Sequence, residues 1–120
     1  MSIAVKRAYE PAGARDGRRI LVDRVWPRGL SKDELEIDEW CRELAPSTDL
    51  RKWFGHDPQR WEEFRKRYTA ELRSAPAREE IARIAGLAKR GKVTLVYGAR
   101  DEEHNQAIVL RDYLQRLVNK

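Results

Sequence analysis

Cysteine and histidine are scarce in this chain of 120 residues, which contains one cysteine and two histidines. The lone Cys41 excludes an internal disulfide bond, and it fits both a reducing compartment and a small core position. His56 and His104 stand 48 positions apart, so the chain lacks the close ligand spacing of a typical zinc site. We therefore predict neither a metal nor a cofactor.

Long hydrophobic runs are also absent. No apolar stretch approaches the roughly 18 to 20 residues that span a membrane, and the first residues, MSIAVKRAYE, lack the apolar core of a signal peptide. The phosphate-binding fingerprints GxGxxG and GxxxxGK[ST] are missing as well. We expect a cytoplasmic protein that makes no membrane contact. Its length predicts a single domain over residues 1–120 and sets no oligomeric state.

Basic side chains outnumber acidic ones, 25 to 20, which gives a formal net charge of +5. The excess is concentrated in residues 1–30, where seven basic side chains face three acidic ones. The arginines there would raise the local concentration of an anionic ligand; they are Arg15, Arg18, Arg19, Arg24 and Arg28. The same charge permits nucleic-acid binding, although no helix-turn-helix, zinc finger or aromatic RNA-binding motif accompanies it.

Apolar patterning predicts alternating strands and helices. Strands are predicted over residues 3–9, 20–25 and 93–97. Helices are predicted to begin near Ser31, Ser47, Asp57, Ala77 and Asp101. The pattern of residues 38–44 fits either a strand or a helix. This order favours an α/β fold with a small, partly parallel sheet flanked by helices, in a three-layer, Rossmann-like arrangement.

Polar residues follow two of the predicted strands. If residues 20–25 and 93–97 are parallel neighbours, the loops after them meet at one edge of the sheet, where α/β proteins bind ligands. Arginine can hold a phosphate or carboxylate with two hydrogen bonds, whereas lysine acts as a point charge. An ionised Asp23 within an apolar strand is costly unless it is paired. The alternative is that Asp23 and Arg24 pair with other charges of the protein.

These loops and the two histidines supply the candidate site residues. Histidine can act as a general acid or base near neutral pH, and Asp101 as a helix cap would turn His104 toward an anion. The alternative is that Asp57 and Asp101 only cap helices and that His104 is exposed. The catalytic candidates are His56, His104 and Asp101. The ligand-binding candidates are Asp23, Arg24, Trp26, Arg28, Lys32, Tyr97, Arg100 and Asn105.

Three segments, ILVDRVWPRGLSK, ELAPSTDLRKWFGHDPQRWEEF and VTLVYGARDEEHNQAIVL, together resemble the YeaO-like family, a domain of unknown function of the DUF488 type. The resemblance covers nearly the whole chain and implies a strand at residues 38–44. Larger relatives in the superfamily tend to have a cysteine at the position of Tyr97, ahead of the arginine that corresponds to Arg100. Tyrosine is a poorer nucleophile at neutral pH, so the resemblance disfavours covalent cysteine chemistry here.

Taken together, these features predict a pocket for a small anion, a phosphate or a carboxylate, at the carboxyl ends of the strands. The residue types leave open whether the protein only binds this ligand or acts on it with a histidine acid or base. The alternative function is a nucleic-acid-binding or protein-binding module without catalysis.

Overall fold

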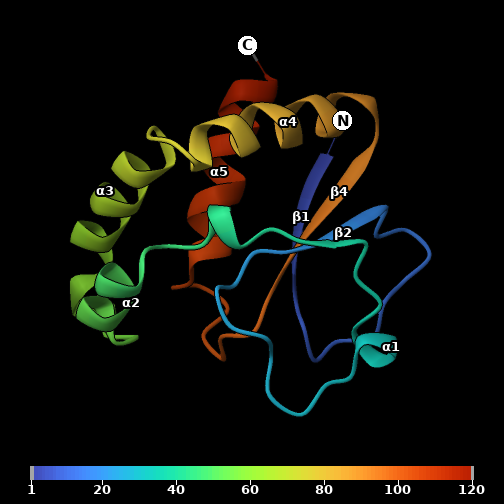
Figure 1. Ribbon diagram of the computed structural model, residues 1–120, viewed down its shortest axis with the longest axis horizontal. Coiled ribbons are helices and arrows are strands. Elements are labelled where there is room, and N and C mark those ends of the chain that lie inside the picture. Colours follow the sequence, from blue (N-terminus) through green and yellow to red (C-terminus); the bar gives the residue numbers. More distant parts are fainter. Residues whose placement is uncertain (1, 120) are drawn as a thin grey trace.

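Four parallel strands form a sheet at the centre of the computed structural model, which describes residues 2–119 (Figure 1). Their order across the sheet is β1 (Ser2–Arg7), β4 (Lys92–Tyr97), β2 (Arg18–Leu21) and β3 (Glu39–Trp40). Each neighbouring pair runs parallel. The predicted α/β class is confirmed, and the last strand of the chain lies between the first two.

β4 is the central strand of this sheet. All of its residues from Val93 to Tyr97 are buried, as expected for a parallel strand that is covered on both faces. Ile20 and Leu21 of β2 pair with its second half. Where β2 begins, Gly17 adopts a left-handed φ of 66°, and a Cβ there would collide with the carbonyl of Lys92. Only glycine fits this close approach without strain.

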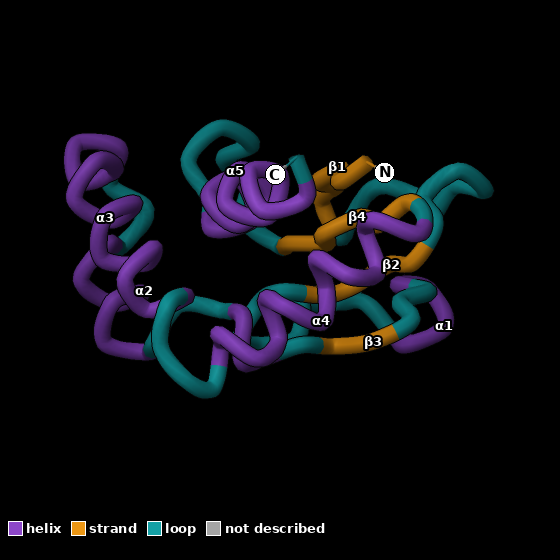
Figure 2. Tube along the Cα trace, turned by 90° about the horizontal axis from the view of Figure 1, so that it is seen from above, coloured by secondary structure: helices purple, strands orange, loops and turns teal. Residues whose placement is uncertain are grey.

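One face of the sheet is covered by α4 (Ala77–Arg90) and α5 (Gln106–Val118), and α2 (Thr48–Phe54) and α3 (Trp61–Leu72) pack beyond them (Figure 2). Burying each large apolar side chain of this core contributes roughly 1.5 to 3 kcal/mol. Fully buried members of the core include Ile20, Phe64, Ile84, Leu95, Leu110 and Leu114. None of the described helices is both long and apolar enough to cross a membrane.

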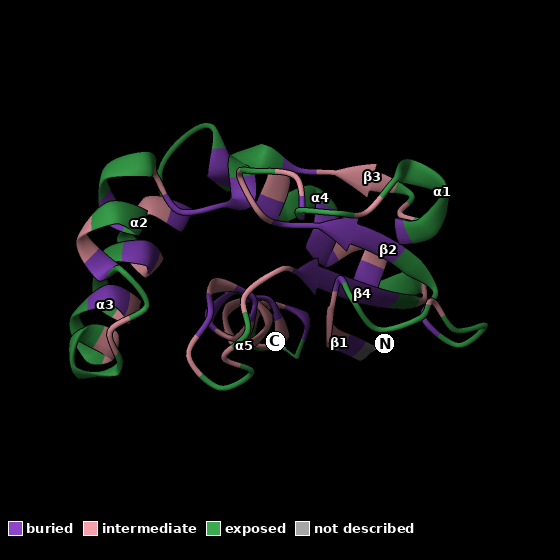
Figure 3. Ribbon diagram, turned by 90° about the horizontal axis from the view of Figure 1, so that it is seen from below, coloured by how far each residue is buried: buried purple, intermediate pink, exposed green. Residues whose placement is uncertain are grey.

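The opposite face of the sheet has a thinner cover, made by the short helix α1 (Lys32–Leu35) and by loops (Figure 3). Leu35 of α1 is fully buried against Leu21 of β2 and its neighbours. Trp26 and Trp40 close this second cluster, with ring centroids 5.3 Å apart in an edge-on arrangement. The third layer of the predicted architecture is therefore one four-residue helix with loops around it.

The predicted helix starts at Ser31, Ser47 and Asp57 are confirmed. Ser31 and Glu34 form a capping box, in which each side chain accepts the backbone N–H of the other. The side chain of Ser47 accepts an N–H of α2. Asp57 caps a single 3₁₀ turn, Pro58–Arg60, which runs directly into α3.

The strand predicted over residues 38–44 is present but short. β3 contains two residues, Glu39–Trp40, and a 3₁₀ turn follows at Arg42–Leu44. Its partner β2 ends at Leu21 and not at residue 25. Because the backbone carbonyl of Leu21 accepts the last ladder bond, from the N–H of Cys41 at 2.9 Å, the residues after Cys41 have no strand to pair with.

The last helix begins at Gln106, and the prediction of Asp101 as its cap is wrong. A carboxylate oxygen of Asp101 accepts two backbone N–H groups of the loop, at 2.9 and 3.0 Å, and closes a separate turn. Asn105 is the cap: its Oδ1 accepts the N–H of Ile108 at 3.1 Å. Asparagine and aspartate serve equally well at this position, so the local pattern did not distinguish the two starts.

Candidate functional site

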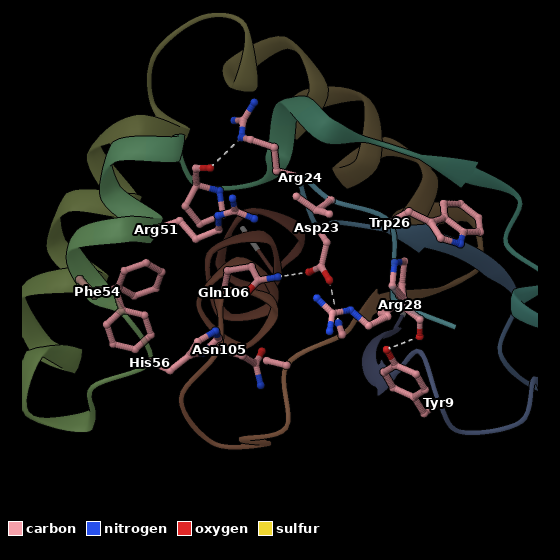
Figure 4. Close-up of a pocket in the computed structure, with 16 residues that line it drawn as sticks. Tyr9, Asp23, Arg24, Trp26, Arg28, Arg51, Phe54, His56, Asn105 and Gln106 are labelled. Carbon is pink, nitrogen blue, oxygen red and sulfur yellow. Dashed lines mark hydrogen bonds between the residues drawn. The ribbon is translucent and has the colours of Figure 1, made fainter. Parts of the chain in front are cut away.

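A cavity of about 260 Å³ opens at the carboxyl edge of the sheet, between the loops that follow β2 and β4 (Figure 4). α2 and the beginning of α5 contribute its other walls. The two loops meet because β2 and β4 are parallel neighbours, and the N–H of Gly98 donates to the Asp23 carboxylate at 2.8 Å. The prediction that these loops share one edge of the sheet is confirmed.

Asp23 lies at the centre of the cavity wall. One of its carboxylate oxygens accepts from Gly98, and the other accepts from the side-chain amide of Gln106 at the start of α5. Burial raises the pKa of Asp23 to about 6, even though these two hydrogen bonds and the positive charge of Arg51 act to lower it. The protein therefore places beside an open cavity a carboxylate that takes up a proton more readily than an ordinary aspartate does.

Arg24 lines the same cavity, but its guanidinium group binds the backbone. Its Nε donates to the carbonyl of Pro46 at 3.0 Å, and one terminal nitrogen donates to the carbonyl of Ala45 at 3.3 Å. These bonds attach the loop after β2 to the segment that precedes α2. Arg24 thus shapes the wall of the cavity, and two nitrogens of its guanidinium group are already bound to the backbone there.

Two other arginines line the cavity with guanidinium groups that have no hydrogen bond or ion pair to any residue in the described range 2–119. Arg28 follows β2, and Arg51 lies in the middle of α2. Figure 4 shows them approaching Asp23 from opposite sides. Both are exposed, so they can bind a ligand without first breaking an internal contact.

His56 lies on the rim of the cavity, directly after α2. It follows Gly55, and both residues have a left-handed φ, 57° for His56 and 53° for Gly55. Its ring packs at 6.1 Å from that of Phe54, and the side chain is exposed. No carboxylate or carbonyl among the described residues orients the imidazole. A general base normally has such a partner to fix its tautomer.

Asn105, Gln106 and Trp26 also line the cavity, and each has a structural bond as well. The buried Asn105 caps α5 and donates to the carbonyl of Asp101 at 2.9 Å. Gln106 holds Asp23. The Trp26 indole donates to the carbonyl of Leu30 at 2.7 Å. These side chains fix the walls around the arginines.

The remaining predicted site residues lie outside the cavity lining. Because the cap of α5 lies four positions later than predicted, Asp101 and His104 stay in the loop, where they pair with each other at 2.9 Å. The rings of His104 and Trp61 are perpendicular to each other, with centroids 5.2 Å apart. Tyr97 is buried in the main core. Arg100 is exposed on the loop after β4, and Lys32 is exposed at the first position of α1.

Three polar lining residues, Tyr9, Arg51 and Gln106, were missing from the prediction. The phenol of Tyr9 donates to the backbone carbonyl of Arg28 at 2.8 Å and so joins the loop after β1 to the site. Arg51 belongs to one of the quoted family motifs, but only the packing of α2 brings it to the sheet edge. No local pattern distinguishes it from the neighbouring solvent-exposed Lys52.

Among the described residues, one group could hold a metal ion, and it lies outside the cavity. It consists of Cys41, Glu43 and Glu80, whose ligand atoms lie within 4.8 Å of one another. Burial and the surrounding carboxylates raise the pKa of Cys41 to about 12. Because a thiol binds metals as its thiolate, a metal ion at this group would have to displace the proton of Cys41.

The fold and the cavity together define a small α/β protein with an open pocket at the carboxyl edge of a parallel sheet. The chain belongs to the family described as the inactive DUF488-N3 subclade, whose model matches residues 2–120. The predicted DUF488-type membership is confirmed.

Curated relatives have nearly the same length as this chain and share much of its sequence. The uncharacterized protein YeaO of Escherichia coli K12 is 47% identical over 117 residues, which cover 98% of this chain and 100% of the relative. The uncharacterized protein Rv3073c of Mycobacterium tuberculosis H37Rv is 40% identical over 112 residues, 93% of this chain and 92% of the relative. No solved structure matches the chain.

Proposed function

We propose that the protein binds a small organic anion, a phosphate or a carboxylate, in the pocket at the carboxyl edge of its sheet. One observation carries the proposal: Arg28 and Arg51 line the cavity from opposite sides and have no partner among residues 2–119. Guanidinium groups match the geometry of phosphate and carboxylate oxygens. The start of α5 beside the cavity adds the positive end of a helix dipole.

We further propose that the protein binds this anion without transforming it. His104 is engaged with Asp101 and Trp61, and His56 lacks a group that would orient it. Tyr97 is buried where larger relatives tend to have a cysteine. The description of the matching family as inactive agrees with a binding role. We place this role in the cytoplasm, where a single thiol such as Cys41 stays reduced.

Calorimetric titration with four probes tests the proposal: phosphoethanolamine, ethyl phosphate, β-alanine and propanoate. We expect at least one probe to bind, and Arg28→Ala and Arg51→Ala each to weaken its binding at least tenfold, because a charge-assisted hydrogen-bonded pair is lost. Arg100→Ala is the matched control, an exposed arginine on the same edge but outside the cavity. It should change affinity less than twofold.

Three results would contradict the proposal. The first is the absence of binding by all four probes, and the second is full affinity in both arginine variants. The third is the release of inorganic phosphate from a bound phosphate ester, detected by ³¹P NMR, because it would show turnover. Binding of a labelled duplex or single strand that weakens steeply between about 50 and 200 mM salt would favour the nucleic-acid alternative.

A further inference from the structure

The Asp23 carboxylate has hydrogen-bonding capacity that the described residues do not fill. An ionised carboxylate offers about four lone-pair positions on its two oxygens. The structure gives each oxygen one donor, Gly98 on one and Gln106 on the other. Asp23 lines the cavity, so the open positions are accessible to whatever occupies it.

No internal cation neutralises this carboxylate directly. Within residues 2–119, no arginine, lysine or histidine nitrogen lies within 4.0 Å of Asp23, the limit for an ion pair. Arg51 acts on it only through longer-range attraction. The guanidinium groups of Arg28 and Arg51 lie on either side of the carboxylate (Figure 4). The cavity thus presents two cations and one anion, held apart.

This arrangement disfavours a simple anion. A bare phosphate or carboxylate placed between the arginines would also lie beside Asp23, and like charges repel. A ligand that carries a hydroxyl or protonated amine next to its anionic group would instead donate to Asp23, and the repulsion would become a charge-assisted hydrogen bond.

The rest of the cavity sets the size and polarity of such a ligand. Its volume of about 260 Å³ lies just below the roughly 300 to 1,000 Å³ of typical small-molecule pockets. Tyr9 and Val25 are the exposed large hydrophobic residues in the described part of the chain, 45% and 55% exposed, and both line the cavity. A short carbon segment of a ligand would cover them.

We propose that the pocket selects small anions that also carry a hydrogen-bond donor, with the anionic group held by Arg28 and Arg51 and the donor held by Asp23. The inference rests on the proposed anion-binding function and specifies its ligand class. It goes beyond charge attraction, because it requires an ordered pair of groups on the ligand.

The same four probes test this selectivity, because they form two matched pairs. Phosphoethanolamine has an ammonium group where ethyl phosphate has none, and β-alanine differs from propanoate in the same way. At pH 7.5 we expect the donor-bearing member of at least one pair to bind the wild type at least tenfold more tightly. Asp23→Asn should reduce this preference to less than threefold. 2-Hydroxyethyl phosphate then distinguishes a hydroxyl donor from an ammonium donor.

The control is Asp101→Asn, which replaces a carboxylate on the same edge that lies outside the cavity and can still close its turn. It should leave the preference unchanged. Thermal unfolding of both variants establishes that each is folded. Equal binding within both pairs, or a preference that survives Asp23→Asn, would overturn the inference and leave the anion-binding function intact. If Arg28→Ala and Arg51→Ala both keep full affinity, the anion-binding function and the inferred ligand class are both overturned.

Discussion

At the scale of single residues, Asp23 lies in surroundings that disfavour its charge. Burial raises its pKa to about 6, compared with an ordinary value of 3.8, so the fold would be more stable if the group were neutral. Unfavourable charges of this kind concentrate at sites where a protein binds or reacts with something. The unfavourable charge of Asp23 therefore agrees with the proposed binding role of the cavity.

Replacing this carboxylate should stabilise the protein. We expect Asp23→Asn to raise the free energy of unfolding at pH 7.5 by about 1 to 3 kcal/mol, since roughly two pKa units correspond to nearly 3 kcal/mol. The asparagine can keep both bonds if the Gln106 amide turns over and accepts. Urea unfolding measures the effect, and a loss of stability would contradict the assignment of a destabilising charge.

The raised pKa of Asp23 also predicts how the stability of the fold changes with pH. Because the folded-state pKa of Asp23 lies above its unfolded value, the folded protein takes up a proton first, and stability rises as pH falls from about 6 to 3.8. In Asp16, hydrogen bonds from Gly13, Lys6 and Arg19 outweigh burial and lower the pKa to about 2. Its contribution is lost only below pH 3.8.

Comparison of the wild type with Asp23→Asn separates the pH dependence caused by Asp23 from that caused by Asp16. The difference in unfolding free energy between the wild type and Asp23→Asn should shrink as pH falls from 7 to 4, as measured by urea unfolding at several pH values. A difference that stays constant over this range would mean that Asp23 titrates normally in the folded protein.

At the scale of elements, the position of α2 determines whether Arg51 reaches the pocket. Glu71 of α3 accepts the backbone N–H of Ser47 at 2.8 Å and its hydroxyl at 2.6 Å, while Ser47 caps α2. The buried hydroxyl of Tyr68, also in α3, donates to the carbonyl of Leu44. α3 thus holds the segment that leads into α2 and places its side chains along the sheet edge.

Removing this attachment should weaken both the fold and the site. We expect Glu71→Ala to lower the free energy of unfolding by about 1 to 3 kcal/mol, because it leaves the Ser47 groups without their charged partner. Binding of the best probe should weaken several-fold, because α2 is then less well held. The control Glu62→Ala, on an exposed side chain of the same helix, should cost less than about 0.5 kcal/mol. Equal effects of the two substitutions would contradict this role.

The elements that the sequence predicted correctly are those that depend on local chemistry. Ser31, Ser47 and Asp57 cap helices through bonds to residues two or three positions away, and such patterns are visible in a linear sequence. The start of α5 was missed because Asp101 and Asn105 are both good caps. The length of β3 depends on where β2 leaves the sheet, which is a tertiary property.

The site residues also divide into those with a local signal in the sequence and those that only tertiary packing brings to the site. Asp23 and Arg28 were recognisable because they follow an apolar strand, and α/β proteins bind ligands at the carboxyl ends of such strands. The parallel pairing of β2 with β4 follows from the apolar sequences of the two strands. Arg51 comes from a helix whose sequence resembles any solvated surface. Its place in the site depends on how α2 and α3 pack, and no local pattern encodes that packing.

At the scale of the whole molecule, the two faces of the sheet have very different cover. One carries four helices, and the other depends on α1 and on the loop that contains Trp26 and Arg28. Leu35 is the buried residue of α1 and connects this loop to the strands. The pocket is therefore built partly on the thinner side of the protein.

Truncation of the Leu35 side chain should lower the stability of the fold substantially, although α1 has only four residues. We expect Leu35→Ala to lower the free energy of unfolding by about 2 to 5 kcal/mol, through lost burial and the cavity left behind. The near-ultraviolet circular dichroism of Trp26 and Trp40 should weaken in the folded variant. Lys32→Ala, at an exposed position of the same helix, should have an effect below about 0.5 kcal/mol. A similar loss in both variants would show that α1 does not anchor this face.

The insertion of β4 between β1 and β2 determines the order in which the protein can be assembled during synthesis. The ribosome makes the N-terminal strands first, but β1 has no neighbour in the sheet until residues 92–97 emerge. The two halves of the pocket, one after β2 and one after β4, likewise come together only when the final third of the polypeptide is present. A nascent or truncated chain therefore holds apolar strands with unpaired edges, the kind of surface that chaperones cover.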